Sequence, residues 1–242
     1  RVGAALVEGP RELARLLAAP RSGALLLVLA GLAVSQFFWV PGLIHDGVPS
    51  AEARGTSLGG IPTSGRTAGP GDAPITIEEF TDFQCPYCGM AHRTILRVIK
   101  QYPGKSRLIH RDYPLDQDCH PRLNRPFHPD ACRAAIYARC AAAQDHYWPY
   151  EHLLFENREQ LSKDDLERYA SRVGLDLDRL RTCVDDPSTR KAVVDDIREG
   201  IRRGVSGTPT LFVNGEKIVG FKDEAFWHKK IAALLRGGSN GG

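Results

Sequence analysis

Residues 75–88 read ITIEEFTDFQCPYC. β-branched and aromatic side chains dominate the first nine, Ile75–Phe83, and predict a strand. Pro86 suits the first position of a helix, because its missing N–H is not needed there, and helical apolar spacing continues to about Tyr102. Cys85 is therefore expected at the helix N-terminus, where free N–H groups and the helix dipole favour a thiolate. Cys88 follows one turn later, which suits a resolving thiol.

A CxxC pair is also half of a common zinc site. No second CxxC or HxxxH pair follows at zinc spacing, so the sequence favours redox chemistry over metal binding at Cys85 and Cys88.

A second motif, Gly207-Thr208-Pro209, precedes a predicted strand at Thr210–Val213. An X-Pro bond at the start of a strand is a candidate cis peptide. Asn214-Gly215 is a strong hairpin signal that leads to a strand at Lys217–Val219. A last helix is predicted from Glu224 to Leu235, before Gly237-Gly238.

The chain between these motifs is predominantly helical after a strand at Arg107–Tyr113. Helices are predicted at Ala131–Gln144, after Ser162, where Asp165 completes a capping box, and after Ser188. The pattern predicts a helical insertion at about 116–204.

The two motifs together resemble the thioredoxin fold, and the 124 residues from Cys85 to Pro209 with their helices resemble DsbA-like thiol:disulfide oxidoreductases. The resemblance implies an α/β thioredoxin fold with a large helical insertion and no cofactor beyond the redox-active disulfide. It implies that Cys85 attacks and Cys88 resolves, and that Thr208 and Pro209 contact both the active site and the substrate.

Two further active-site features follow from the resemblance. Glu79, six residues before Cys85, matches a buried family glutamate that relays protons to the resolving cysteine; otherwise it is a solvated strand carboxylate. The dipeptide Pro86-Tyr87 replaces the Pro-His of the most oxidising members, so Tyr87 supplies no imidazolium to the Cys85 thiolate.

Four cysteines remain, and their even number predicts two structural disulfides in an oxidising compartment. Cys132 and Cys140 are eight residues apart on one predicted helix, about 12 Å along its axis, which is too far for a bridge. Two pairings remain: 119–132 with 140–183, or 119–140 with 132–183. The resemblance favours the first, because a bridge like 140–183 occurs in the helical domain of DsbA-like proteins. A zinc site from Cys119, His120, His128 and Cys132 is the alternative, although its spacing matches no common finger.

The N-terminal part carries a membrane signal. Gly23–Val40 has no charged residue and is nearly long enough to cross a bilayer. Four arginines precede it, which predicts a cytoplasmic segment at 1–21, a transmembrane helix at 22–44 and an extracytoplasmic remainder. A signal peptide cleaved at Ala33-Val34-Ser35 is the alternative. The sequence predicts a Gly/Pro/Ser-rich linker at 45–71, a folded domain at 72–236 and a disordered tail at 237–242.

These features predict a membrane-tethered enzyme that introduces disulfides into exported proteins on the periplasmic side. A quinone-linked membrane oxidase, DsbB-like or similar to vitamin K epoxide reductase, is the expected reoxidising partner. The chain resembles the C-terminal part of fusions in which the latter type of domain lies upstream. The alternatives are an anchored reductase or isomerase of the same fold, and a redox-inert binding or chaperone module. The net charge of +3 over 242 residues argues against nucleic-acid binding.

Overall fold

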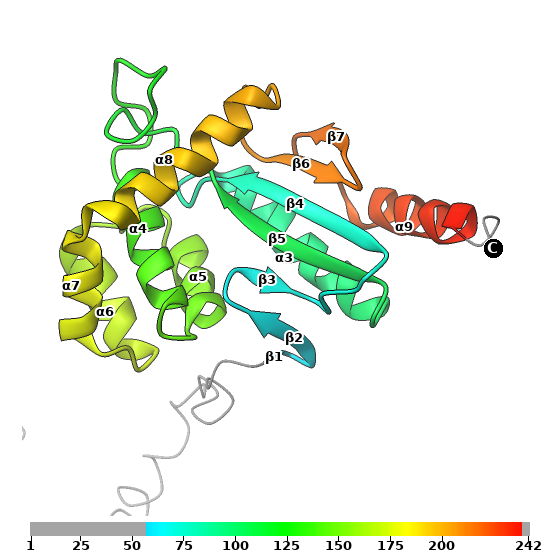
Figure 1. The fold of residues 1–242 in the computed structure, drawn as a ribbon, viewed down its shortest axis with the longest axis horizontal. Coiled ribbons are helices and arrows are strands. Elements are labelled where there is room, and N and C mark those ends of the chain that lie inside the picture. The colour runs from blue at the N-terminus through cyan, green and yellow to red at the C-terminus, as the bar shows by residue number, and fades with distance from the viewer. Residues whose placement is uncertain (1–56, 239–242) are drawn as a thin grey trace, which may run out of the picture. The chain divides into compact units, whose positions relative to one another are not determined.

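A seven-stranded mixed sheet organises residues 57–238, which are the residues that the computed structural model describes. Its strand order is β1-β2-β3-β5-β4-β6-β7, and β4 and β5 are its parallel central pair (Figure 1). All other neighbours are antiparallel. The strands are β1 Ser57–Leu58, β2 Ile61–Ser64, β3 Thr67–Ala68, β4 Ile75–Thr81, β5 Ser106–Asp112, β6 Thr210–Val213 and β7 Glu216–Val219.

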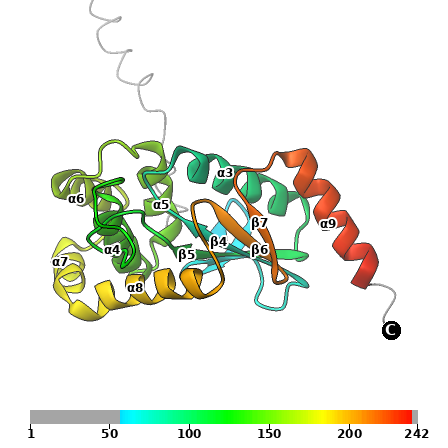
Figure 2. The same ribbon diagram turned by 90° about the horizontal axis from the view of Figure 1, so that it is seen from above.

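Helices cover both faces of this sheet. Helix α3 (Pro86–Gln101) lies on one face and α8 (Pro187–Arg202) crosses the other, as Figure 2 shows. Successive side chains of β4 alternate between these two faces. Glu79 therefore shares the α3 side with Ile77, whereas Phe80 lies on the α8 side, where its ring is close to Gly200.

The predicted helical insertion is present between β5 and β6. It comprises α4 (Ala131–Ala142), α5 (Tyr147–Glu156), α6 (Lys163–Arg172), α7 (Leu177–Asp185) and α8. The capping box is formed as predicted, since Ser162 and Asp165 exchange hydrogen bonds at the start of α6. Asn214 has a positive φ in the β6–β7 hairpin, as the Asn-Gly signal requires. These observations confirm the thioredoxin-like α/β fold with a helical insertion.

The linker prediction is wrong for residues 57–68, which form β1, β2 and β3 at one edge of the sheet. Glycines that we interpreted as flexible instead make tight turns: Gly59 and Gly60 have positive φ between β1 and β2, and Gly65 does so between β2 and β3. Ala68 is fully buried against the core. Strands of two to four residues are too short for a periodic sequence signal.

The C-terminal boundary is also different from the prediction, because helix α9 extends from Glu224 through Gly238. Within residues 57–238, no helix has the length and apolar character needed to cross a bilayer. The predicted cytoplasmic segment, the transmembrane helix at 22–44, the cleavage site and residues 45–56 of the linker lie outside this range, as do residues 239–242 of the predicted tail.

Candidate active site

The CxxC pair lies where β4 leads into α3. Cys85 is the N-cap residue of α3, with extended backbone angles, and Pro86 occupies the first turn. The N–H of Cys88 donates to the carbonyl of Cys85 over 3.1 Å. Cys88 is fully buried and Cys85 nearly so, and the two thiols are not joined. Cys85 thus stands at the accessible end of the pair, as the sequence predicts.

The pKa values of the two thiols are shifted in opposite directions. Hydrogen bonding to Cys88 lowers the pKa of Cys85 to about 6, although burial opposes this, and Thr208 also contributes to the lowering. Burial raises the pKa of Cys88 well above its usual value, and its hydrogen bond to Cys85 acts in the same direction. At neutral pH the pair therefore consists of one thiolate nucleophile and one protonated partner.

The Thr208-Pro209 peptide bond is cis and lies beside the pair. Strand β6 pairs with β4 so that Thr210 is opposite Phe80, which brings the loop before β6 to the end of β4. Sγ of Cys85 lies 3.5 Å from the main-chain carbonyl oxygen of Thr208. The two motifs that the sequence places 124 residues apart thus meet at one site.

Asp82 and His128 form a second polar pair at this site. The N–H of Cys85 donates to the carbonyl of Asp82. The Asp82 carboxylate is buried and accepts hydrogen bonds from the N–H groups of Gln84 and Leu115, both at 2.7 Å, and from Nδ1 of His128 at 2.8 Å. Burial opposes protonation of His128, but hydrogen bonding to Asp82 raises its pKa, and the charge of Cys85 contributes.

Glu79 is fully buried rather than solvated. Its Oε2 lies 3.3 Å from Nδ1 of His92 on α3, and Nε2 of His92 lies 3.1 Å from Glu151 on α5. The second oxygen of Glu79, Oε1, is buried and has no hydrogen-bond partner.

Comparisons with known proteins agree with this geometry. The family model described as thioredoxin matches residues 63–233. The chain belongs to the thioredoxin family. Its fold is also that of a solved DsbA-like protein, the thiol-disulfide exchange protein alpha-DsbA2 from Wolbachia pipientis. The two share a TM-score of 0.59 at 22% identity, over 69% of this chain and 86% of the other.

The chain is also similar to proteins that are named as Na(+)/H(+) antiporters. The thioredoxin-family chain is 36% identical over 156 residues to Na(+)/H(+) antiporter NhaA 3 of Salinispora tropica, which covers 64% of this chain but 22% of that protein. It is 30% identical over 203 residues to Na(+)/H(+) antiporter NhaA 1 of Mycobacterium sp. strain KMS, over 82% of this chain and 32% of the other. The chain thus spans about a fifth to a third of the length of these relatives.

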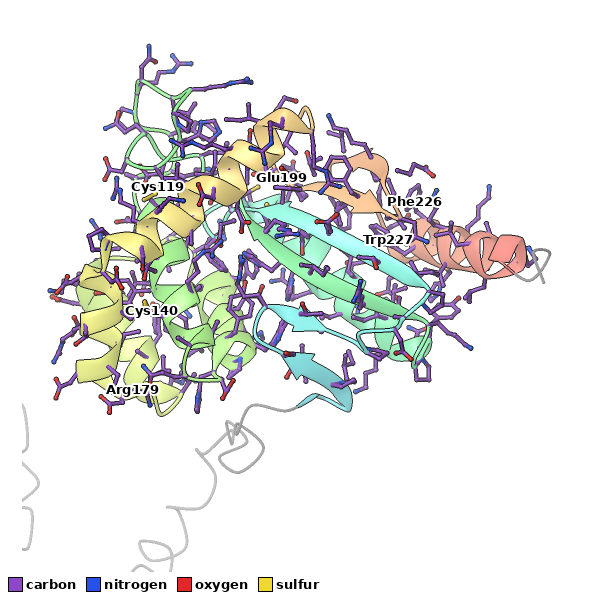
Figure 3. All side chains as sticks on the ribbon, viewed as in Figure 1. Cys119, Cys140, Arg179, Glu199, Phe226 and Trp227 are labelled. Carbon is purple, nitrogen blue, oxygen red and sulfur yellow. A yellow bond between two sulfur atoms is a disulfide. The ribbon has the colours of Figure 1, made fainter. Side chains whose placement is uncertain are left out.

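The structural cysteines of this thioredoxin-family domain are paired within the insertion. Cys119 is joined to Cys132 and Cys140 to Cys183, with Cα–Cα distances of 5.6 and 5.7 Å. Figure 3 shows Cys119 in the loop before α4 and Cys140 within α4. The zinc alternative is wrong, because both of its thiols are in a disulfide and His128 pairs with Asp82. In the described part of the chain, no group of three or more His, Cys, Asp or Glu residues is placed to hold a metal ion.

Sequence reasoning missed Asp82, His92, Glu151 and His128. His92 and His110 are buried in ion pairs with carboxylates. His128 was considered only as a zinc ligand. The one available signal was the position of His92, four residues after Cys88 and thus on the same face of α3.

Proposed function

We propose that this domain is a protein thiol:disulfide oxidoreductase that oxidises thiols of exported proteins. The observation that supports it most is the pair of opposite acidities, with a lowered pKa at Cys85 and a raised pKa at Cys88. A client thiolate attacks Cys85 of the Cys85–Cys88 disulfide, Cys88 leaves, and a second client thiol then displaces Cys85. The client gains a disulfide and the enzyme departs as a dithiol.

The acidity of Cys85 favours the oxidising direction. A pKa of about 6 leaves about ten thiolates for each thiol at pH 7, which stabilises the reduced enzyme relative to one with an unperturbed cysteine. A more stable reduced form makes the disulfide form a stronger oxidant.

Exposed apolar side chains near Cys85 support a protein substrate. Tyr87 and Met90 on α3 are 59% and 40% exposed, and Phe127, which stacks on His128, is 65% exposed. Extended client segments with apolar side chains fit such a surface. We assign client contact to these three residues together with Thr208 and Pro209.

The reduction potential tests this function. Equilibration of the Cys85–Cys88 pair with glutathione buffers should give a value more oxidising than about −200 mV. A value near that of thioredoxin, about −270 mV, would assign the domain to the reductase or isomerase alternative. Absence of thiol exchange with any dithiol would assign it to the redox-inert binding alternative.

We also propose that the domain is tethered to a membrane and works on its outer face. Two structural disulfides support an oxidising compartment. The match to the antiporter of strain KMS covers 82% of this chain, which is more than residues 57–242 contain. Reoxidation by a quinone-linked DsbB-like or vitamin K epoxide reductase-like membrane protein completes the cycle.

The names of the relatives favour a membrane transporter as the polypeptide that carries this domain, over a fused vitamin K epoxide reductase-like domain. Immunoblotting of native membranes with an antibody against residues 57–238 tests both proposals. A band several times heavier than 26.6 kDa whose upstream peptides match an antiporter supports the first. Upstream peptides of a quinone-linked oxidase support the second, and recovery only in the soluble fraction contradicts the tether.

A further inference from the structure

A continuous series of buried charged groups begins at Glu79 and leads away from the thiol pair. His92 bridges Glu79 and Glu151 through its two ring nitrogens, at 3.3 and 3.1 Å. The other oxygen of Glu151 lies 3.0 Å from Nδ1 of His110, whose Nε2 lies 3.3 Å from Asp112. All five side chains are almost fully buried. Such a series is costly unless every charge has a partner of opposite sign.

The series ends at two arginines. Arg66 and Arg139 both pair with Asp112 and with Asp196. Because arginine does not release its proton in proteins, the charge of Asp112 is fixed, and its pKa is held far below the usual range by these partners against the effect of burial. The two arginines therefore fix the charge at one end of the series, and acidic and basic side chains alternate from there to Glu79.

His92 is consequently an imidazolium at neutral pH. Burial alone would lower its pKa, but the charge and hydrogen bond of Glu151, with those of Glu79, raise it to about 10. Glu151 remains ionised, because His92 and His110 lower its pKa to about 2 against the effect of burial. The His92 imidazolium thus pairs with Oε2 of Glu79, whereas Oε1 of Glu79 has no hydrogen-bond partner.

The resolving thiol lies on the same helix face as His92. Cys88 and His92 are one turn apart on the same buried face of α3, about 6 Å along the helix axis. Thr81, whose hydroxyl lowers the pKa of Cys88, is on the same side of β4 as Glu79 and two residues from it. Cys88 and His92 therefore both lie on the face of α3 that packs on the side of β4 carrying Thr81 and Glu79.

We propose that His92, held by Glu151, is a positioning residue that orients Glu79 to take the proton of Cys88. The inference rests on the proposed function and adds the insertion helix α5 to the redox centre. In resolution, the proton of Cys88 passes to Glu79 and the Cys88 sulfur forms a bond to Cys85. The bond from Cys85 to the client sulfur breaks, and the client leaves as a thiolate with that electron pair. In the oxidising direction, Glu79 returns the proton to Cys88 as it leaves.

Two aromatic side chains of α5 also contact this series. The hydroxyl of Tyr147 donates to Glu151 over 3.3 Å, and the ring of Trp148 stacks on His92. The charged and titratable groups that form the series, contact its members or pair with the carboxylates at its end are Glu79 on β4, His92 on α3, Glu151 and Tyr147 on α5, His110, Asp112 and Arg111 on β5, Arg139 on α4, Asp196 on α8 and Arg66 in the β2–β3 turn. Cys88 lies on the same buried face of α3 as His92.

Rapid mixing of the reduced protein with the chromogenic disulfide dithiobis(nitrobenzoate) separates the two thiols. Attack by Cys85 releases one coloured thiolate, and resolution by Cys88 releases a second. In His92→Gln the second release should slow at least tenfold at pH 7, and its acid limb should move to higher pH. The first release should stay within twofold. His152→Gln is the matched control, because His152 pairs with Glu156 on the exposed side of α5.

An unchanged profile of the second release between pH 5 and 9 in a folded His92→Gln protein would overturn the inference while leaving the function intact. Absence of the first release in the unsubstituted protein would overturn the function itself. If His92→Gln does not fold, nitrogen NMR of the unsubstituted protein decides the question. A doubly protonated His92 ring at pH 7 that shifts on reduction of the disulfide supports the inference, and a neutral ring at pH 7 contradicts it.

Discussion

Nδ1 of His128 lies 2.8 Å from Oδ2 of Asp82, and the main-chain carbonyl of that aspartate accepts the N–H of Cys85. A residue of the insertion loop therefore neutralises a buried negative charge beside the nucleophile. That charge raises the pKa of Cys85. The cation that the Pro86-Tyr87 dipeptide lacks is supplied from another part of the chain.

Removal of this imidazole should make Cys85 less acidic. In His128→Ala the Asp82 charge is uncompensated, so the pKa of Cys85 should rise from about 6 by roughly one unit. Thiolate absorbance against pH on the reduced protein measures it. Phe127→Ala is the neighbouring control and should leave the titration in place. An equal shift in both variants would mean that the loop acts through its shape and not through the imidazole.

Substitution of the two active-site cysteines should have different consequences. Cys85→Ser should abolish thiol exchange, because Cys88 is fully buried and protonated. Cys88→Ser should retain the nucleophile and accumulate mixed disulfides with client proteins, visible as reducible adducts on gels. Adducts that form with Cys85→Ser and not with Cys88→Ser would reverse the two roles.

The buried imidazolium predicts a specific loss of stability in alkali. The pKa of folded His92 is about 10, above its value of about 6.5 in the unfolded chain. Its contribution to the free energy of unfolding is therefore complete below about pH 6.5 and is lost as the pH rises toward 10. Glu151 behaves in the opposite way: its folded pKa of about 2 gives stability that is present above about pH 4.5 and lost toward pH 2.

Urea unfolding at several pH values measures the loss of unfolding free energy in both alkali and acid. His92→Gln should flatten the fall between pH 7 and 10, and Glu151→Gln should flatten the fall below pH 4.5. The exposed pair of His152 and Glu156 provides the control, since its substitution should change neither limb. If His92→Gln keeps the full alkaline slope, another group causes it.

Gly200 is required for the packing of α8 on the sheet. A Cβ at this position would lie 2.6 Å from the ring of Tyr113, whose hydroxyl donates to Val205. Gly200→Ala should therefore reduce the free energy of unfolding by about 1–3 kcal/mol, although alanine is the better helix former by about 1 kcal/mol. Gly89→Ala in α3 is the control, because its Cβ would meet ordinary contacts at 3.4 Å. Equal effects of the two substitutions would contradict the packing argument.

The two structural disulfides should contribute unequally. The Cys140–Cys183 bridge closes a loop with a sequence separation of 43 and the Cys119–Cys132 bridge one of 13. Loop-closure entropy predicts a loss of about 4 kcal/mol when the first is removed by paired alanines and about 3 kcal/mol for the second. Chemical unfolding of the two double variants compares them directly. A larger loss for the shorter loop would show that native contacts and not chain entropy decide the order.

The parts of the fold that follow local rules could be predicted from the sequence. The strand–Cys-Pro-Tyr-Cys–helix unit, the Ser162 capping box and the Asn214-Gly215 hairpin each depend on residues within one turn or strand. The strands β1 to β3 could not, because their glycines form turns only where β5 provides a pairing edge for β3.

The same distinction applies to the site. The expected roles of Cys85 and Cys88 follow from their place at a helix N-terminus. The series from Glu79 to Asp112 joins β4, α3, α5 and β5, so all of its contacts except that of His110 with Asp112 link different elements of the fold. A histidine or glutamate in such a helix has no local feature that distinguishes a buried ion pair from a surface one.

The buried series of alternating charges constrains how this domain can diverge. His92 is the charged partner of Glu79, so replacement of His92 alone leaves that carboxyl group in the core without a counter-ion. A lineage can abandon the series only by exchanging several members together for apolar residues of similar volume. Relatives should therefore keep His92 and Glu79 together or replace both.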